Sequence, residues 1–335
     1  MAGKLAPAAL ALLLAGCPSG PDAAQPPEVD LSTARRLESE GKTLEAVVEL
    51  ARLVDELTAS GRSDARAHAA WARILASLHR LKAGERLALA SAETRKQCES
   101  LKDWCSSVGQ GLTSTGAVGH WSKVLSLGSE PAVLAEAAGA IADLFEEKAD
   151  TPGLRRGRLD LVEGLSESLY RRSLIQASSD YARYAVSRAP GSATKARAVR
   201  LLRRLAKELR EVASQSGVLP VPKARWSDQA EGAEALAAAL ESAQGADPGV
   251  TNDLRREVES DTNALMLSAT EQLNKANDLL SRRADEAEIL DSLERALRHF
   301  VAARESLVEP SPNQRRALDV MSIAADALRH QAFQD

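Results

Sequence analysis

The chain has 335 residues, of which 44% are hydrophobic, 27% are charged and only 3% are aromatic. Its net charge of −4 gives no overall attraction to nucleic acid, so no nucleic-acid partner is expected. Aromatic and β-branched residues favour strands, and their scarcity argues against a strand-rich fold. After residue 17, no apolar run reaches the ~18 residues that a membrane-spanning helix needs.

The N-terminus has the pattern of an export signal. Lys4 supplies a positive charge, and residues 5–15 form an apolar run of 11 residues. At ~1.5 Å per residue this run is too short to cross a bilayer core of ~30 Å. Residues 1–16 are therefore expected to be a cleaved signal peptide.

The end of this signal is Leu14-Ala15-Gly16-Cys17, which resembles the lipobox of bacterial lipoprotein precursors. The resemblance implies cleavage before Cys17, a diacylglycerol on the Cys17 sulfur and acylation of the new amine. Two or three acyl chains would hold the protein at a membrane. Pro18 stands where an Asp favours inner-membrane retention in enteric bacteria, which favours the outer membrane over the inner one. The alternative is a cysteine that follows an ordinary signal peptide by chance.

The remainder divides by composition. Residues 17–30 contain four prolines and almost no bulky apolar side chain, so they are expected to form a lipidated flexible tether. Residues 31–215 and 227–335 show helical periodicity and are expected to be a helical-repeat-like domain and a C-terminal helical region. Between them, residues 216–226 contain Pro220 and Pro222 and are expected to be a linker, because prolines interrupt helices.

The helical part is expected to contain about 12–14 helices in an all-α fold. In residues 193–212 the apolar side chains recur at intervals of four and three, which is the spacing of one helix face. This stripe consists of Ala198, Leu202, Leu205, Leu209 and Val212.

Several helices resemble those of tetratricopeptide repeats. The resemblance implies paired helices that touch through small residues and stack into an α-solenoid with a concave binding surface. It is loose, because no 34-residue period is sustained, and an irregular helical array is the alternative. The matching residues are Gly41, Ala46, Leu50 and Leu53, then Ala185 with Pro190, and Ala296, Phe300 and Ala303.

No motif predicts catalysis, a cofactor or a metal. The five histidines are never three or four residues apart, so helical metal-ligand spacing is absent. Glu167-Ser168 matches the catalytic dipeptide of lytic transglycosylases, but the downstream motif of that family has no counterpart here. A glutamate on a solvated helix face is therefore the favoured interpretation.

Cys98 and Cys105 would remain as a pair in an oxidising compartment. On one unbroken helix their Cα atoms would be ~10.5 Å apart, too far for a disulfide. A bridge therefore requires the helix to end between them, and two free thiols are the alternative.

Charge is unevenly distributed. Residues 155–211 contain 14 Lys or Arg and 6 Asp or Glu, whereas residues 228–335 contain 11 and 21. A possible interaction face therefore lies on the helix expected at 193–212, although a purely solvated face is the alternative. Its basic residues are Lys195, Arg197, Arg200, Arg203, Arg204, Lys207 and Arg210.

Together these patterns predict a non-enzymatic, membrane-anchored lipoprotein that faces the periplasm and acts as a scaffold for other envelope proteins. Assembly factors and secretin pilotins are the nearest familiar class, by analogy alone. The alternative is a cell-wall protein that binds peptidoglycan or cleaves it like a lytic transglycosylase.

Overall fold

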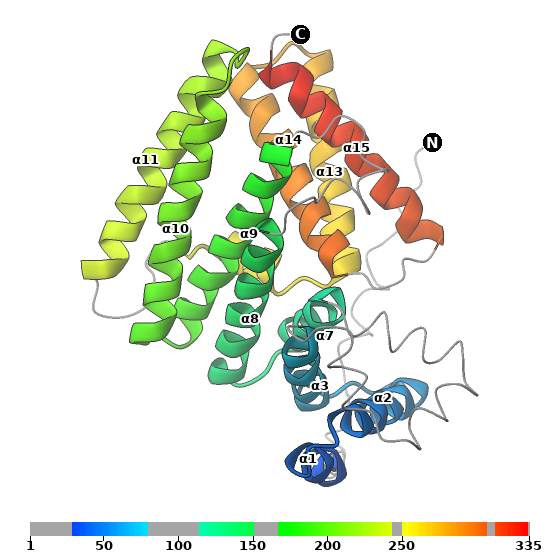
Figure 1. Cartoon of the computed structure of the whole chain (residues 1–335). Coiled ribbons are helices and arrows are strands. Elements are labelled where there is room, and N and C mark those ends of the chain that lie inside the picture. Colours follow the sequence, from blue (N-terminus) through cyan, green and yellow to red (C-terminus); the bar gives the residue numbers. More distant parts are fainter. Residues whose placement is uncertain (1–28, 80–113, 151–166, 243–249, 307–311, 334–335) are drawn as a thin grey trace, which may run out of the picture. The chain divides into compact units, whose positions relative to one another are not determined.

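Helices make up nearly all of the backbone in the computed structural model, which describes residues 29–79, 114–150, 167–242, 250–306 and 312–333 (Figure 1). Within these ranges there are twelve α-helices and no strand, apart from one isolated bridge between Val218 and Phe333. The expected all-α fold is thus confirmed. The helices are α1 (Ser32–Ser39), α2 (Thr43–Ala59), α3 (Ala65–His79), α7 (Ser114–Leu127), α8 (Pro131–Ala149), α9 (Glu167–Arg188), α10 (Ser192–Ala213), α11 (Pro220–Ser242), α12 (Asn252–Val258), α13 (Thr262–Ser281), α14 (Glu286–Glu305) and α15 (Pro312–Ala332).

Helix starts follow from local chemistry. The side chains of Thr251 and Asp261 accept hydrogen bonds from the backbone N–H groups of Leu254 and Ala264, which caps α12 and α13. Helices α8, α11 and α15 begin at a proline. Proline suits this position because the backbone N–H that it lacks would have no partner in the first turn of a helix. Gly41, in the turn between α1 and α2, has φ +74°, a conformation that glycine adopts without steric cost.

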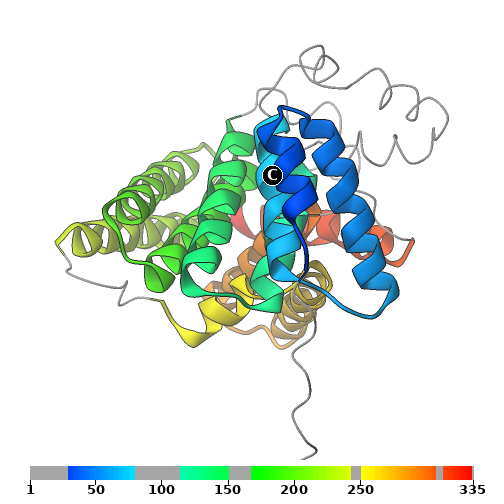
Figure 2. The same ribbon diagram turned by 90° about the horizontal axis from the view of Figure 1, so that it is seen from below.

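Most helices that follow one another in the chain pack together, whereas α12 packs on α9. Neighbouring pairs include α8 with α9, α10 with α11 and α13 with α14 (Figure 1). Helices α1, α2 and α3, drawn in blue, also lie side by side (Figure 2). Contacts between helices that are distant in sequence, such as α9 with α14, join these pairs, and Leu31–Asp335 form one compact unit.

Alanines allow the helices to approach closely. Many are completely buried, and they lie beside a few large side chains such as Trp121, Trp226 and Phe145. Most of the positions with tetratricopeptide-like spacing are buried, namely Ala46 and Leu50 on α2, Ala185 on α9, and Ala296, Phe300 and Ala303 on α14. Leu53 is only half-buried, and Gly41 and Pro190 are exposed.

The prediction of a linker at 216–226 is wrong for its second half, because residues 220–226 belong to α11. Pro220 and Pro222 lie in the first turn of α11, where proline is compatible with a helix. Trp226 is fully buried one turn later. The preceding turn is also fixed, because Leu219 donates its N–H to the carbonyl of Ala332 at 2.9 Å.

Of the helices described, none is both long and apolar enough to cross a membrane. Cys17, Cys98 and Cys105 lie outside the described residues, as do the lipobox, the signal peptide and most of the tether.

Candidate functional site

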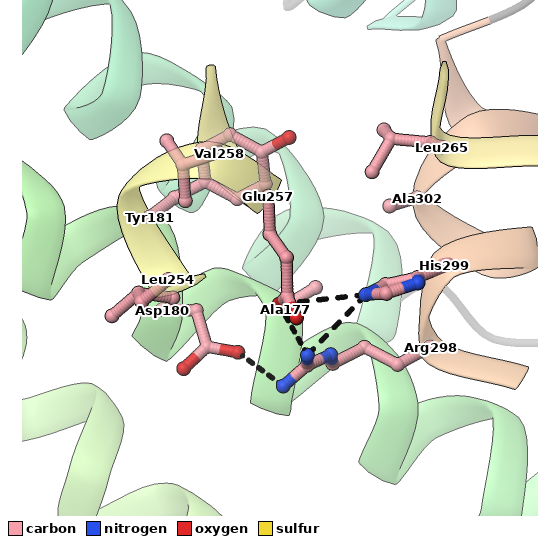
Figure 3. A pocket seen from close by; sticks show the side chains of 10 residues that line it. All are labelled: Ala177, Asp180, Tyr181, Leu254, Glu257, Val258, Leu265, Arg298, His299 and Ala302. Carbon is pink, nitrogen blue, oxygen red and sulfur yellow. Dashed lines mark hydrogen bonds and ion pairs between the residues drawn. The ribbon is translucent and has the colours of Figure 1, made fainter. Parts of the chain in front are cut away.

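The cluster of charges in Figure 3 surrounds a small cavity between α9, α12, α13 and α14. Arg298 donates to Asp180 at 2.9 Å and also bonds Glu257, while His299 Nε2 lies 3.4 Å from the Glu257 carboxylate. Burial raises the pKa of Asp180. Burial also acts to raise the pKa of Glu257, but the hydrogen bond from His299 and the charge of Arg298 outweigh it and bring that pKa to about 2.

Two carboxyl groups with separated pKa values can indicate acid–base catalysis. The cavity volume decides against that interpretation here. It is about 20 Å³, which accommodates about one water molecule and no sugar ring. We therefore regard this cluster as an ion-pair network that joins three helices.

A much larger hollow lies between α3, α7, α8 and the start of α10, with a volume of about 540 Å³. This is within the ~300–1,000 Å³ typical of ligand sites. Its lining is mainly apolar, with small side chains predominating, and we call it the alanine groove. It is lined by Ala76, Trp121, Ala132, Ala135, Ala140, Leu144 and Ala189, and by the polar residues Arg73, Ser77, Glu136, Asp143, Thr194 and Arg197.

Two bidentate ion pairs fix charged groups in the groove. Arg73 of α3 binds Glu136 of α8 through two hydrogen bonds of 2.6 Å. Arg197 of α10 binds Asp143 of α8 at 2.8 and 2.9 Å. Glu136 and Asp143 are seven residues apart and so share one face of α8. Paired arginine and carboxylate forks hold each other in a defined orientation.

Gly139 stands between these two carboxylates along α8. A Cβ at this position would lie 2.7 Å from Nη1 of Arg197. The absence of a side chain at Gly139 therefore lets the Arg197 guanidinium lie directly against the helix and reach Asp143.

Trp121 is the largest apolar side chain in the groove. Its ring is 1% exposed, and the Arg73 guanidinium lies over it at 5.9 Å. Its indole Nε1 is buried and has no hydrogen-bond partner in the structure as described. Buried tryptophan N–H groups normally have an acceptor, and an unpaired buried donor costs about 1–3 kcal/mol.

Next to the groove, two histidines join α3 to α7. The Nδ1 atoms of His68 and His120 are 2.9 Å apart, and Trp71 stacks on the His120 ring at 4.0 Å. One ring must donate and the other accept, so at least one Nδ1 is unprotonated. Among the described residues, no group of three or more His, Cys, Asp or Glu side chains that could hold a metal ion includes this pair.

The basic residues predicted as an interaction face lie along α10, where most of them meet carboxylates. Arg197 and Arg200 reach α8 at Asp143 and Glu146, and Arg204 reaches Asp150, the residue that follows α8. Arg203 and Arg210 reach α11, at Glu241 and Glu234, and Lys207 pairs with Glu211 of α10 itself. Lys195 lies in the first turn of the helix. These charges thus connect α10 to its neighbours, and Arg197 alone of the seven lines the groove.

The groove was not anticipated from the sequence. Its ion pairs join residues 63 and 54 positions apart, and no local pattern indicates such pairs. The available signal was on α8, where Glu136, Gly139 and Asp143 recur on one helix face.

No known protein family, curated protein or solved structure matches this chain.

Proposed function

We propose that this chain is a membrane-anchored, periplasm-facing lipoprotein that acts as a non-enzymatic scaffold for other envelope proteins, and that the alanine groove is its binding site. The anchor rests on the lipobox-like sequence at Cys17. The binding role rests on one observation, the groove of about 540 Å³ with an alanine-rich lining and fixed charges. Small lining residues leave room for the side chains of a partner, and the paired arginines and carboxylates supply polar contacts that orient it.

The proposal is tested by filling the groove. Ala132 lines it and is exposed, and Ala140 lines it and is half-buried, so tryptophan at either position occupies the groove from its open side. Cells that produce the native lipidated protein are treated with a crosslinker, and the attached proteins are identified by mass spectrometry. We expect Ala132→Trp and Ala140→Trp to lose crosslinked neighbours that the unaltered protein retains.

Ala238→Trp is the matched control, because Ala238 is exposed on α11 and does not line the groove. It should retain the same neighbours. If the two groove variants capture the same proteins as the control, the groove is not the binding site.

A further inference from the structure

The unpaired indole of Trp121 indicates which atoms a ligand must present. A buried N–H without an acceptor is unfavourable in the free protein, and a ligand oxygen can supply the missing acceptor. Arg73 lies over the ring, and both Arg73 and its partner Glu136 are partly exposed, so the ion pair can shift as a unit and give a ligand access to the indole.

Other groove groups also favour a ligand that accepts hydrogen bonds. Arg73 and Arg197 each donate hydrogen bonds from Nε and Nη2 to their partner carboxylates. Neither Nη1 group takes part in these bonds. The hydroxyls of Ser77 and Thr194 donate to carbonyls of their own chain segments. Among the side chains that line the groove, the donors that remain for a ligand therefore belong to Trp121 and the two arginines.

The acceptor should be uncharged. Glu136 and Asp143 already neutralise the two arginines, and a ligand carboxylate would meet these like charges. Main-chain carbonyls are uncharged acceptors that recur along a peptide, and small alanine side chains let a peptide backbone approach closely.

We infer that the alanine groove holds an extended, uncharged peptide segment with short aliphatic side chains, whose main-chain carbonyl oxygens accept hydrogen bonds from Trp121 Nε1 and from the arginines. This inference rests on the proposed scaffold function and specifies the part of the partner that the groove recognises.

The probe is an equimolar pool of acetylated and amidated octapeptides built from Gly, Ala, Val and Leu. It is added to the mature chain carrying ¹⁵N in its four tryptophan indoles. The Trp121 signal is the one missing from Trp121→Phe, a variant that removes the N–H and keeps an aromatic ring. We expect this signal to move downfield on binding. We also expect Trp121→Phe to bind the pool about tenfold more weakly, the change that corresponds to one lost hydrogen bond of about 1.4 kcal/mol.

Trp71→Phe is the matched control. The Trp71 indole Nε1 is also buried and unpaired, but Trp71 stacks on His120 and does not line the groove. Both variants remove an unpaired buried donor, so neither should lower the free energy of unfolding through that group. Only Trp121→Phe should weaken peptide binding.

Three results would overturn the inference: a Trp121 signal that stays in place at millimolar pool, equal weakening by the two variants, or tighter binding of a pool that contains Asp and Glu. If Ala140→Trp loses its cellular crosslinks while Trp121→Phe binds the peptide pool normally, the scaffold function is supported. The inferred hydrogen bond from Trp121 to a peptide carbonyl is then wrong.

Discussion

At the scale of single residues, buried charges in the described core have partners from distant parts of the chain. Arg172 of α9 is 1% exposed and lies 2.9 Å from Glu294 of α14. Trp226 of α11 donates to the same carboxylate at 2.6 Å. Burial acts to raise the pKa of Glu294. The charge of Arg172 and the hydrogen bond from Trp226 lower that pKa by more than burial raises it, so the net shift is downward. Breaking such a buried pair typically costs about 3–5 kcal/mol, so we expect the loss of either partner to destabilise the fold.

The histidine pair makes the stability of the chain sensitive to acid. Burial, together with the positive charge of Lys123, lowers the pKa of His68 to about 4, although Asp64 opposes this shift. Burial and the neighbouring His68 lower the pKa of His120 to about 3. In the unfolded chain both rings have a pKa near 6.5, so the unfolded state binds more protons below that pH.

This linkage predicts that the free energy of unfolding falls as pH drops below about 6.5, by up to about 1.4 kcal/mol per pH unit for each ring. The loss should continue until the folded pKa values of about 4 and about 3 are reached. Urea unfolding at pH 7 and pH 5 measures the effect. His120→Phe removes one titrating ring and should make the pH dependence shallower.

His330→Gln serves as the control, because His330 is exposed near the end of α15. It should leave the pH dependence as it is in the unaltered chain. An identical loss between pH 7 and pH 5 in His120→Phe would show that other groups cause the acid sensitivity.

At the scale of helices, sequence periodicity predicted which faces are buried but not which helices meet. The stripe of α10, including Ala198, Leu202 and Leu209, is buried as its spacing indicated. Periodicity reports only that a face is apolar, so it contains no information on the partner helix. The charge pattern was also ambiguous, because the carboxylates that hold the basic face of α10 come from both α8 and α11. The groove was unpredictable for the same reason, since four helix segments must assemble to form it.

The contact between α7 and the end of α14 depends on the absence of a side chain at Gly119. A Cβ there would lie 2.8 Å from the carbonyl oxygen of Ser306, which is backbone and cannot rotate away. We expect Gly119→Ala to lower the free energy of unfolding by about 1–3 kcal/mol, as overpacking does. Chemical denaturation measures this loss.

Gly232→Ala in α11 is the matched variant, because nothing lies within 4 Å of a Cβ at that position. It should raise the free energy of unfolding by about 0.5–1 kcal/mol, since alanine favours the helix. Equal effects of the two substitutions would mean that α7 and α14 do not approach as closely as described.

At the scale of the whole molecule, the sequence predicts one attachment to the membrane, through Cys17. Cys17→Ser should abolish incorporation of labelled palmitate, because the hydroxyl is a much weaker nucleophile than the thiol. Cys98→Ser, which also replaces a single cysteine, should be labelled as the unaltered protein is. Persistent labelling of Cys17→Ser, or no labelling of the unaltered protein, would refute the lipoprotein assignment.

The bridge between Val218 and Phe333, with the hydrogen bond from Leu219 to Ala332, has a consequence for biosynthesis. The turn that leads into α11 takes its backbone partners from Ala332 and Phe333, which are translated long after α11. A ribosome that has completed α10 and α11 has not yet made the residues that fix the turn between them. This joint therefore closes only after residues 332 and 333 have been made.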